Sequence, residues 1–166
     1  MTDEAGGEAF DQLVGLLDYP MFVVTTGADD DLAGCLVGFT SQVSIRPSRF
    51  LVGLSKRNHT YRVARRAAHL AVHLLPRRKR ALARLFGSET GDRINKFDRC
   101  AWHEGPYSVP ILDDAIGWFA GRILNQFDVG DHVGFLLDPI AGHAPARFDE
   151  LVTFSDVRDL EPGHEA

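Results

Sequence analysis

Short blocks of β-branched and other apolar residues, separated by glycine, proline and aspartate, recur along most of this chain. Blocks of this length, bounded by turn-forming residues, are typical of β-strands. The two longest blocks flank the turn Asp128-Val129-Gly130-Asp131, which predicts a long hairpin. The expected strands are residues 21–26, 32–39, 50–54, 70–75, 116–127 and 132–140, with a shorter one near 151–154.

Helical spacing of apolar residues marks three other segments. The chain starts with an amphipathic stretch that Pro20 ends. Asn58 is a plausible N-cap for a second helix, and Pro76 begins a basic helix that extends to Phe86. The apolar positions of the first helix are Phe10, Leu13, Val14, Leu16 and Leu17.

Several antiparallel strands with helices between them predict a mainly β fold, a β-barrel with flanking helices. At 166 residues the chain has the length for one such core and little room for a second. We expect a disordered tail over residues 1–8, a single domain over 9–160 and a second tail over 161–166. Inside the domain, residues 87–110 have the composition of a loop.

Composition narrows the function classes. With 45% hydrophobic and 25% charged residues the chain is not globally disordered, and its net charge of −5 gives no general attraction to nucleic acid or anionic membranes. No apolar run approaches the ~18 residues of a membrane span, and the acidic N-terminus is unlike a signal peptide, so we expect a cytoplasmic protein. Cys35 and Cys100 form no CxxC pair, and Cys35, within an apolar run, is expected to be a buried free thiol.

Several motifs are absent from the sequence. It has no GxGxxG after a strand, no P-loop, no GxSxG elbow and no HExxH, which argues against Rossmann, nucleotide-triphosphate, serine-hydrolase and zincin chemistry. His69 and His73 lie four apart in a predicted strand, ~13 Å along it, too far to share a metal. We therefore expect no metal site.

The first candidate binding segment follows the strand at 32–39. Backbone groups lose their ladder partners where that strand ends, so they could meet the polar edge of a flat ligand. The alternative is an ordinary turn whose hydroxyls satisfy their own backbone. The candidate residues are Phe39, Thr40, Ser41, Gln42, Val43 and Ser44.

The second candidate segment begins a helix eleven residues later. Asn58 as N-cap would leave unpaired N–H groups where the helix dipole favours an anion, and cations and hydroxyls surround it. This pattern suits a phosphate; the alternative is a capped helix with a solvated basic entry. The candidate residues are Ser55, Lys56, Arg57, Asn58, His59 and Thr60.

Two weaker signals remain. The basic helix from Arg77 to Arg84 is either a solvated face or a dock for a second phosphorylated ligand such as a reduced nicotinamide. After the hairpin turn, Asp131 could orient His132, a candidate catalytic group that titrates near neutral pH; a structural turn is the alternative.

With these residues in order, the chain resembles the flavin reductase-like family of FMN-binding split barrels from Pro20 to Ile140. The resemblance rests on the joint order of motifs, none of which is diagnostic alone. They are MFVVTTG, TSQVS with a following proline, FLVGLSKRNHT, AVHLL, Phe86, Phe97, residues 109–115 and Gly130-Asp131-His132.

The resemblance implies a Greek-key barrel, a homodimer, and FMN in a groove near the subunit interface. It implies that Thr40 to Ser44 meets the ring and ribityl chain, that Ser55 to Thr60 meets the phosphate, and that His132 lies near the flavin or nicotinamide. Phe39-Thr40 is bulkier and Lys56 to Thr60 more basic than the family pattern, which leaves FAD or F420 as alternatives to FMN.

The function expected is that of an NAD(P)H:flavin oxidoreductase whose bound FMN takes hydride from NAD(P)H as co-substrate and passes electrons to an acceptor or a partner monooxygenase. The alternatives are a non-catalytic FMN-binding electron carrier and a split-barrel protein that uses FAD or F420.

Overall fold

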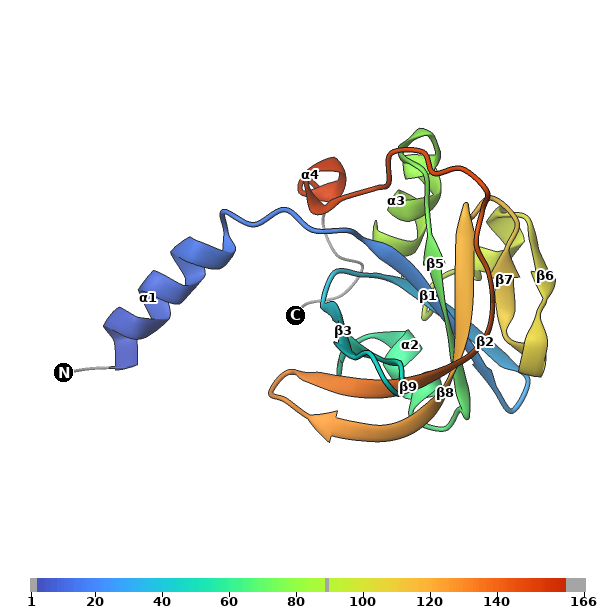
Figure 1. The fold of residues 1–166 in the computed structure, drawn as a ribbon, viewed down its shortest axis with the longest axis horizontal. Coiled ribbons are helices and arrows are strands. Elements are labelled where there is room, and N and C mark those ends of the chain that lie inside the picture. The colour runs from blue at the N-terminus through green and yellow to red at the C-terminus, as the bar shows by residue number, and fades with distance from the viewer. Residues whose placement is uncertain (1–2, 89, 161–166) are drawn as a thin grey trace.

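The computed structural model describes residues 3–88 and 90–160 (Figure 1). Its strands are β1 (Phe22–Ala28), β2 (Asp31–Val37), β3 (Thr40–Ser44), β4 (Arg49–Ser55), β5 (His69–Leu74), β6 (Trp102–Glu104), β7 (Pro110–Leu112), β8 (Gly117–Asp128) and β9 (His132–His143). Its helices are α1 (Asp3–Val14), α2 (His59–Ala64), α3 (Arg80–Ser88) and α4 (Phe154–Val157), with short 3-10 helices η1 (Arg77–Lys79), η2 (Lys96–Arg99) and η3 (Pro106–Ser108).

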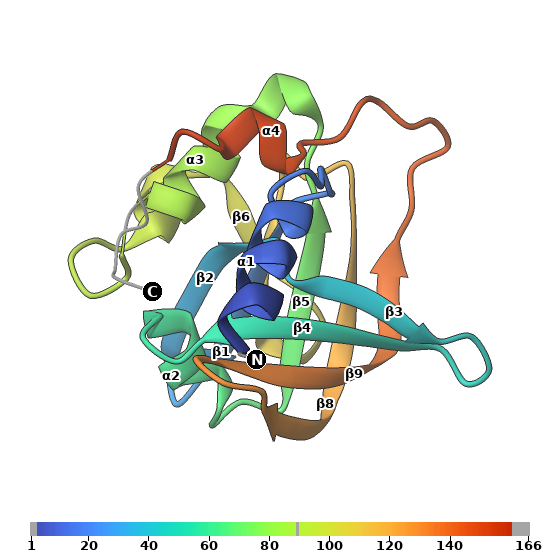
Figure 2. The same ribbon diagram turned by 90° about the vertical axis from the view of Figure 1, so that its left-hand side faces the viewer.

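Seven strands form one antiparallel sheet in the order β2-β1-β5-β8-β9-β4-β3, while β6 and β7 pair separately. This sheet confirms the predicted mainly β fold. The β1–β2 pair forms one end of the sheet and the β3–β4 pair forms the other, with β5, β8 and β9 between them. The β8–β9 ladder contains two register shifts, and such bulges bend and twist a sheet. Figure 2 shows the resulting change of strand direction between β5 and β4.

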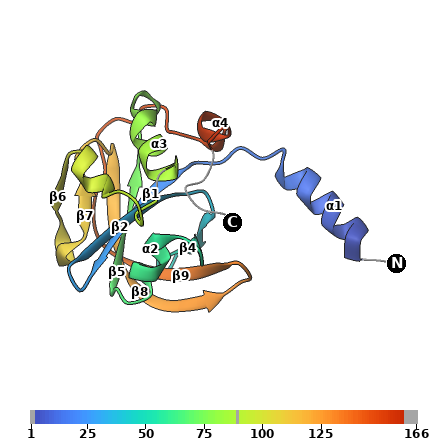
Figure 3. The same ribbon diagram turned by 180° about the vertical axis from the view of Figure 1, so that it is seen from behind.

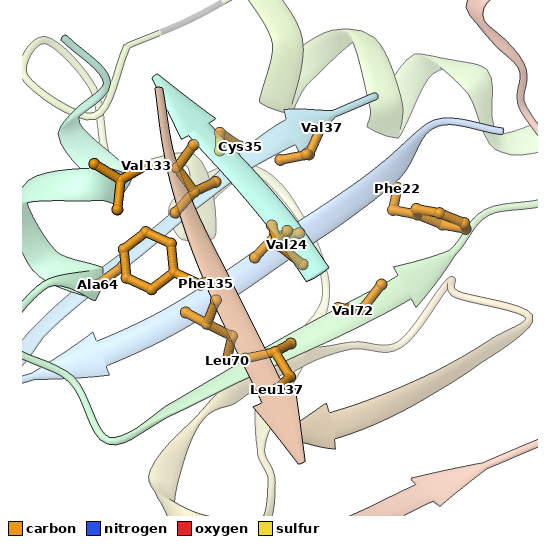
Figure 4. Close-up of a cluster of buried hydrophobic side chains, with 12 residues drawn as sticks. Phe22, Val24, Cys35, Val37, Ala64, Leu70, Val72, Val133, Phe135 and Leu137 are labelled. Atoms are coloured by element: carbon orange, nitrogen blue, oxygen red, sulfur yellow. The ribbon is translucent and has the colours of Figure 1, made fainter. Parts of the chain in front are cut away.

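The curled sheet encloses a core to which both of its ends contribute. Val24 of β1, Cys35 of β2, Val52 of β4 and Phe135 of β9 all belong to one buried cluster, part of which Figure 4 shows. Apolar residues on the inward faces of these strands therefore form the core of the barrel. Cys35 is confirmed as a buried free thiol, and burial raises its pKa.

The first helix differs from the prediction in its bounds. It begins at Asp3 and ends at Val14, so residues 3–8, which we expected in a disordered tail, are helical. It points away from the barrel (Figures 1 and 3), and its apolar side chains are exposed, by 63% for Phe10 and 64% for Leu13. The predicted tail at 161–166 lies outside the described residues.

Two other predictions were wrong. The strand expected near 151–154 is replaced by isolated bridges of Leu151 to Pro76 and of Thr153 to Pro20. Thr153 is instead the N-cap of α4, where the Asp156 carboxylate accepts the Thr153 N–H at 2.9 Å in a capping box. The expected loop over 87–110 contains η2, β6 and η3.

The structure places Thr40–Ser44 in a strand instead of the expected break. It pairs with β4 on one side only, which makes β3 an edge strand. In the part of the chain that the structure describes, no helix is long and apolar enough to cross a bilayer.

Candidate functional site

A cavity of about 310 Å³ opens at the end of the barrel, between the strands on one side and α3 and α4 on the other. We call it the barrel-end cavity. Its size lies within the range of small-molecule sites. The barrel wall includes Gly38, Phe39, Gly53, Ser55, Asn58 and His132, and the opposite wall includes Phe86, Gly87, Thr90, Lys96, Phe154 and Val157.

The first candidate segment meets this cavity through Phe39 alone. The Phe39 carbonyl accepts the Gly53 N–H at 2.7 Å, and a Cβ on Gly53 would come within 3.2 Å of the Phe39 Cβ, so the β2–β3 link lies close over β4. Residues Thr40–Ser44 continue outward as the edge strand β3 and do not line the cavity.

Two polar side chains of β3 satisfy their own segment. Ser41 Oγ donates to the Gln42 carbonyl at 3.0 Å, and Gln42 Nε2 donates to the Ser44 carbonyl at 3.1 Å. Such local bonds were part of the alternative interpretation, although the segment is a strand and not a turn. The outer edge of β3 has no strand beside it in the described sheet, so its main-chain groups on that side are open to a ligand.

The residues of the second candidate segment do not all face the barrel-end cavity. Ser55 and Asn58 line the barrel-end cavity, whereas Lys56, Arg57, His59 and Thr60 do not. Asn58 caps α2 as predicted, since its Oδ1 accepts the Thr60 N–H at 2.9 Å. Ser55 Oγ accepts the Arg57 N–H at 3.3 Å, which fixes the hydroxyl at the end of β4.

The remaining side chains of this segment have partners elsewhere. Lys56 Nζ lies 2.8 Å from Asp128 Oδ2, and His59 Nδ1 lies 3.2 Å from Asp92 Oδ1. Thr60 is buried. Of this segment, the Ser55 and Asn58 residues line the cavity, whereas its cations lie outside the cavity lining.

His132 lines the same cavity. Register pairs it with Ser55 across β4 and β9, and its ring lies 5.0 Å from the Phe39 ring, tilted by 50°. The hydrogen bond from the imidazole Nδ1 to Asp131 Oδ1, at 2.7 Å, orients the ring and lowers the pKa of Asp131. The sequence prediction that Asp131 orients His132 is thus met in the geometry.

The sequence analysis missed Lys96 and Thr90 on the opposite wall. Lys96 is 5% exposed, and its Nζ donates to the Gly34 carbonyl at 2.9 Å and the Phe86 carbonyl at 3.0 Å. A lysine is buried only when its charge is satisfied, so its burial is a tertiary effect. In the sequence, the local sign that Lys96 is buried was its position directly before the apolar Phe97.

The arginines of the basic helix make ion pairs with the C-terminal segment. Arg77 meets Glu150 at 2.8 Å, and Arg84 meets Asp159 at 2.8 Å. These contacts tie η1 and α3 to the segments that flank α4, and neither arginine lines the barrel-end cavity.

Within the described residues, no group of three or more histidine, cysteine, aspartate and glutamate side chains could hold a metal ion. His69 stacks on Tyr107 at 4.1 Å, whereas His73 is fully buried and bonded to backbone on both sides.

The residues around the cavity fit an FMN. One part of the wall offers donors from Ser55 and Asn58, the aromatic rings of Phe39 and His132 lie at another, and the buried Lys96 charge lies across from them. Such a set matches a ligand with a polar tail and a flat aromatic head.

Comparisons with known proteins identify the family of this chain. The sequence model described as "Flavin reductase like domain" matches residues 14–159. The chain is 29% identical over 119 residues to the FMN reductase (NADH) RutF 2 of Rhizobium rhizogenes, covering 72% of this chain and 68% of that protein. It is 23% identical over 117 residues to the 4-hydroxyphenylacetate 3-monooxygenase reductase component of Escherichia coli, covering 70% and 69% of the two chains.

The fold also matches solved structures. The NADH:FAD oxidoreductase SgcE6 of Streptomyces globisporus superposes with a TM-score of 0.80 at 24% identity, over 94% of this chain and 92% of that one. A match at this identity supports the fold. Because the family model spans most of the chain, the protein belongs to the flavin reductase-like domain family.

Proposed function

We propose that this protein is a flavin-dependent oxidoreductase that binds FMN, supports its reduction by NADH and passes the electrons to an acceptor or a partner oxygenase. The observation that carries the proposal is the barrel-end cavity, where Phe39, Ser55, Asn58 and His132 converge in a chain of this family. Relatives named as an NADH-dependent FMN reductase and as a monooxygenase reductase component support the substrates and the partner.

In this proposal the Ser55 hydroxyl and the Asn58 amide hold the ribityl and phosphate end of the flavin. Hydroxyl and amide donors bind an anion without adding charge, which suits a wall from which Lys56 is drawn away by Asp128. The open outer edge of β3, with its residues Thr40–Ser44, remains the candidate for main-chain contacts to the ring.

A bound flavin would supply the redox chemistry, as an acceptor of hydride from the nicotinamide and a donor of electrons. The protein's part is to orient the ring and exclude water, so no acid–base pair is needed. His132, held by Asp131, positions one side of the ring and is the candidate for holding a proton there.

A spectrum and two binding titrations test the proposal. Purified protein mixed with FMN should show flavin absorbance after desalting, and the double variant Ser55→Ala/Asn58→Ala should weaken FMN at least tenfold while weakening riboflavin, which lacks the phosphate, less than threefold. Glu104→Gln, on an exposed strand remote from the cavity, is the matched control. Equal losses for both flavins would remove the phosphate assignment.

Turnover is tested separately by NADH oxidation with and without added FMN. The reductase should exceed the background rate of free flavin severalfold, and NADPH gives the comparison of reductants. Tight FMN binding with oxidation no faster than background would contradict the enzyme and favour the electron-carrier alternative.

We also propose that the protein is a homodimer in which α1 packs on a second copy. A 12-residue helix is marginal by itself, and the apolar side chains of α1 lack cover within the described chain. The helix carries acidic Glu4, Glu8 and Asp11, whereas the β3–β4 hairpin offers the exposed Ile45 beside the exposed Arg46, so charge and apolarity are complementary.

Light scattering during gel filtration tests this arrangement. The wild type should elute with twice the mass of the 18.3-kDa chain, and Leu13→Glu should shift it toward the monomer. A wild type that stays monomeric at tens of micromolar would contradict the proposal.

We further propose a cytoplasmic location. Cys35 and Cys100 are both free thiols, as is usual for proteins of reducing compartments, and this supports the proposal.

A further inference from the structure

Lys56 lies inside the turn that presents the candidate phosphate-binding groups. The Asn58 N–H donates to the Ser55 carbonyl at 3.0 Å, so residues 55–58 form a tight turn, and both of its end residues line the barrel-end cavity. Lys56 directly follows Ser55 in this turn. Because a lysine ammonium stands on a flexible four-carbon stem, Lys56 can swing to an anion that is held by Ser55 and Asn58.

Asp128, in the β8–β9 hairpin, holds this ammonium away from the cavity. Lys56 Nζ donates to Asp128 Oδ2 at 2.8 Å, and this hydrogen bond keeps the pKa of Asp128 below its usual value. The Lys56 and Asp128 side chains are 38% and 73% exposed, and ion pairs in contact with water are weak. A phosphate monoester carries a charge of about −1.5 to −2 at pH 7, more than a carboxylate, so it competes with Asp128 for the ammonium.

The two turns stay together without this ion pair. The Lys56 N–H donates to the Asp131 carbonyl at 2.9 Å, a main-chain bond that no side-chain substitution at residue 128 removes. Within the hairpin turn, Asp128 Oδ1 accepts the Gly130 N–H at 3.1 Å, and the amide oxygen of an asparagine can accept the same N–H. Asp128→Asn therefore removes the charge that holds Lys56 and keeps the turn.

We infer that Asp128 is a specificity-determining residue, which lowers the affinity of this protein for phosphorylated flavin by competing with the phosphate for Lys56. The inference rests on the proposed flavin site, with the phosphate at Ser55 and Asn58. Riboflavin has no phosphate, so its affinity does not depend on where the Lys56 ammonium lies. Affinity differences between related complexes lie mostly in the dissociation rate, so the ion pair also shortens the time for which FMN stays bound.

Calorimetric titration of the full chain with FMN and with riboflavin tests the inference. Asp128→Asn should bind FMN at least threefold more tightly than the wild type and should change the affinity for riboflavin less than 1.5-fold. Glu104→Gln, which removes one negative charge from an exposed position outside the cavity lining, is the matched control and should change neither affinity. An unchanged FMN affinity in Asp128→Asn, or equal gains for FMN and riboflavin, would overturn the inference.

A double-mutant cycle shows whether Asp128 acts through Lys56. Lys56→Met should leave the FMN affinity within twofold of the wild type, and the double variant Lys56→Met/Asp128→Asn should lose the gain of Asp128→Asn. A gain that persists without Lys56 would mean that the Asp128 charge simply repels the ligand, and it too would overturn the inference. Added salt screens the new contact, so it should weaken FMN binding more in Asp128→Asn than in the wild type.

The same titrations separate this inference from the proposed function. Failure of both FMN and riboflavin to bind the wild type would overturn the proposed function, whereas normal binding without the Asp128 effect would overturn the inference alone. Circular dichroism verifies that each variant folds. Asp128→Ser, whose hydroxyl oxygen can also accept the Gly130 N–H, removes the same charge and gives a second measurement if Asp128→Asn folds poorly.

Discussion

His73 provides the sharpest test of the packing described here. It is fully buried in β5, where its Nδ1 donates to the Val23 carbonyl at 2.9 Å and its Nε2 accepts the Leu112 N–H at 3.1 Å. These two bonds need the neutral ring and tie β1 and β7 to β5. Burial accordingly lowers the pKa of His73 from 6.5 to about 4.

The sign of the pH effect follows from this pKa. Below pH 6.5 the unfolded chain binds a proton at His73 that the folded protein refuses until the pH approaches 4. Stability is therefore full above pH 6.5, falls as the pH drops from 6.5 to 4, and is constant below that. Between pH 7.5 and 5.0 this one group should lower the free energy of unfolding by about 2 kcal/mol.

Urea unfolding followed by tryptophan fluorescence measures the effect at pH 7.5, 6.5, 5.5 and 5.0. His73→Phe leaves two buried backbone groups without partners, so it should cost about 2–4 kcal/mol at pH 7.5 but lack the acid decline. His69, whose pKa is lowered by partial burial and then by Arg122, adds to the decline of both proteins, so their difference isolates His73.

The exposed His143 supplies the control, and His143→Gln should retain the wild-type slope. The carboxylates whose pKa values are lowered, such as Asp92 beside Arg62, lose their contribution only as the pH falls through 3.8 and below. A wild type that loses less than about 0.5 kcal/mol by pH 5.0, or a His73→Phe protein with the same decline, would refute the reasoning.

Two further substitutions probe a helix cap and a close backbone contact in the core. Asn58→Ala removes the cap of α2 and should lower the free energy of unfolding by about 1 kcal/mol, measured by urea denaturation; Asn58→Asp, which can still accept the same N–H, should recover most of the loss. Gly34→Ala would bring a Cβ within 2.7 Å of the buried Phe86 ring and should cost about 1–3 kcal/mol, whereas Gly6→Ala on α1, with nothing within 4 Å, should cost nothing; equal unfolding midpoints for the two alanine variants would contradict the packing.

Local signals were sufficient for much of the fold. The hairpin of β8 and β9 follows from two long apolar blocks and a turn in which Gly130 takes a φ of 138°. The N-cap at Asn58 was equally local, because a cap depends on residues two or three apart. The error near 151–154 had the same origin: a short apolar block suggested a strand, while the competing capping box of Thr153 and Asp156 was overlooked.

The sequence by itself determined that this chain forms a mainly β barrel of the flavin reductase-like kind, and which two segments were candidates for the ligand. Only the tertiary structure decided which side chains face the cavity. Lys56 leaves the candidate phosphate site because Asp128, 72 residues away, meets its ammonium, and Lys96 enters the wall because Gly34 and Phe86 offer it carbonyl oxygens. The physical reason is that strand alternation and capping act over a few residues, whereas a buried charge takes its position from partners that only the closed barrel brings together.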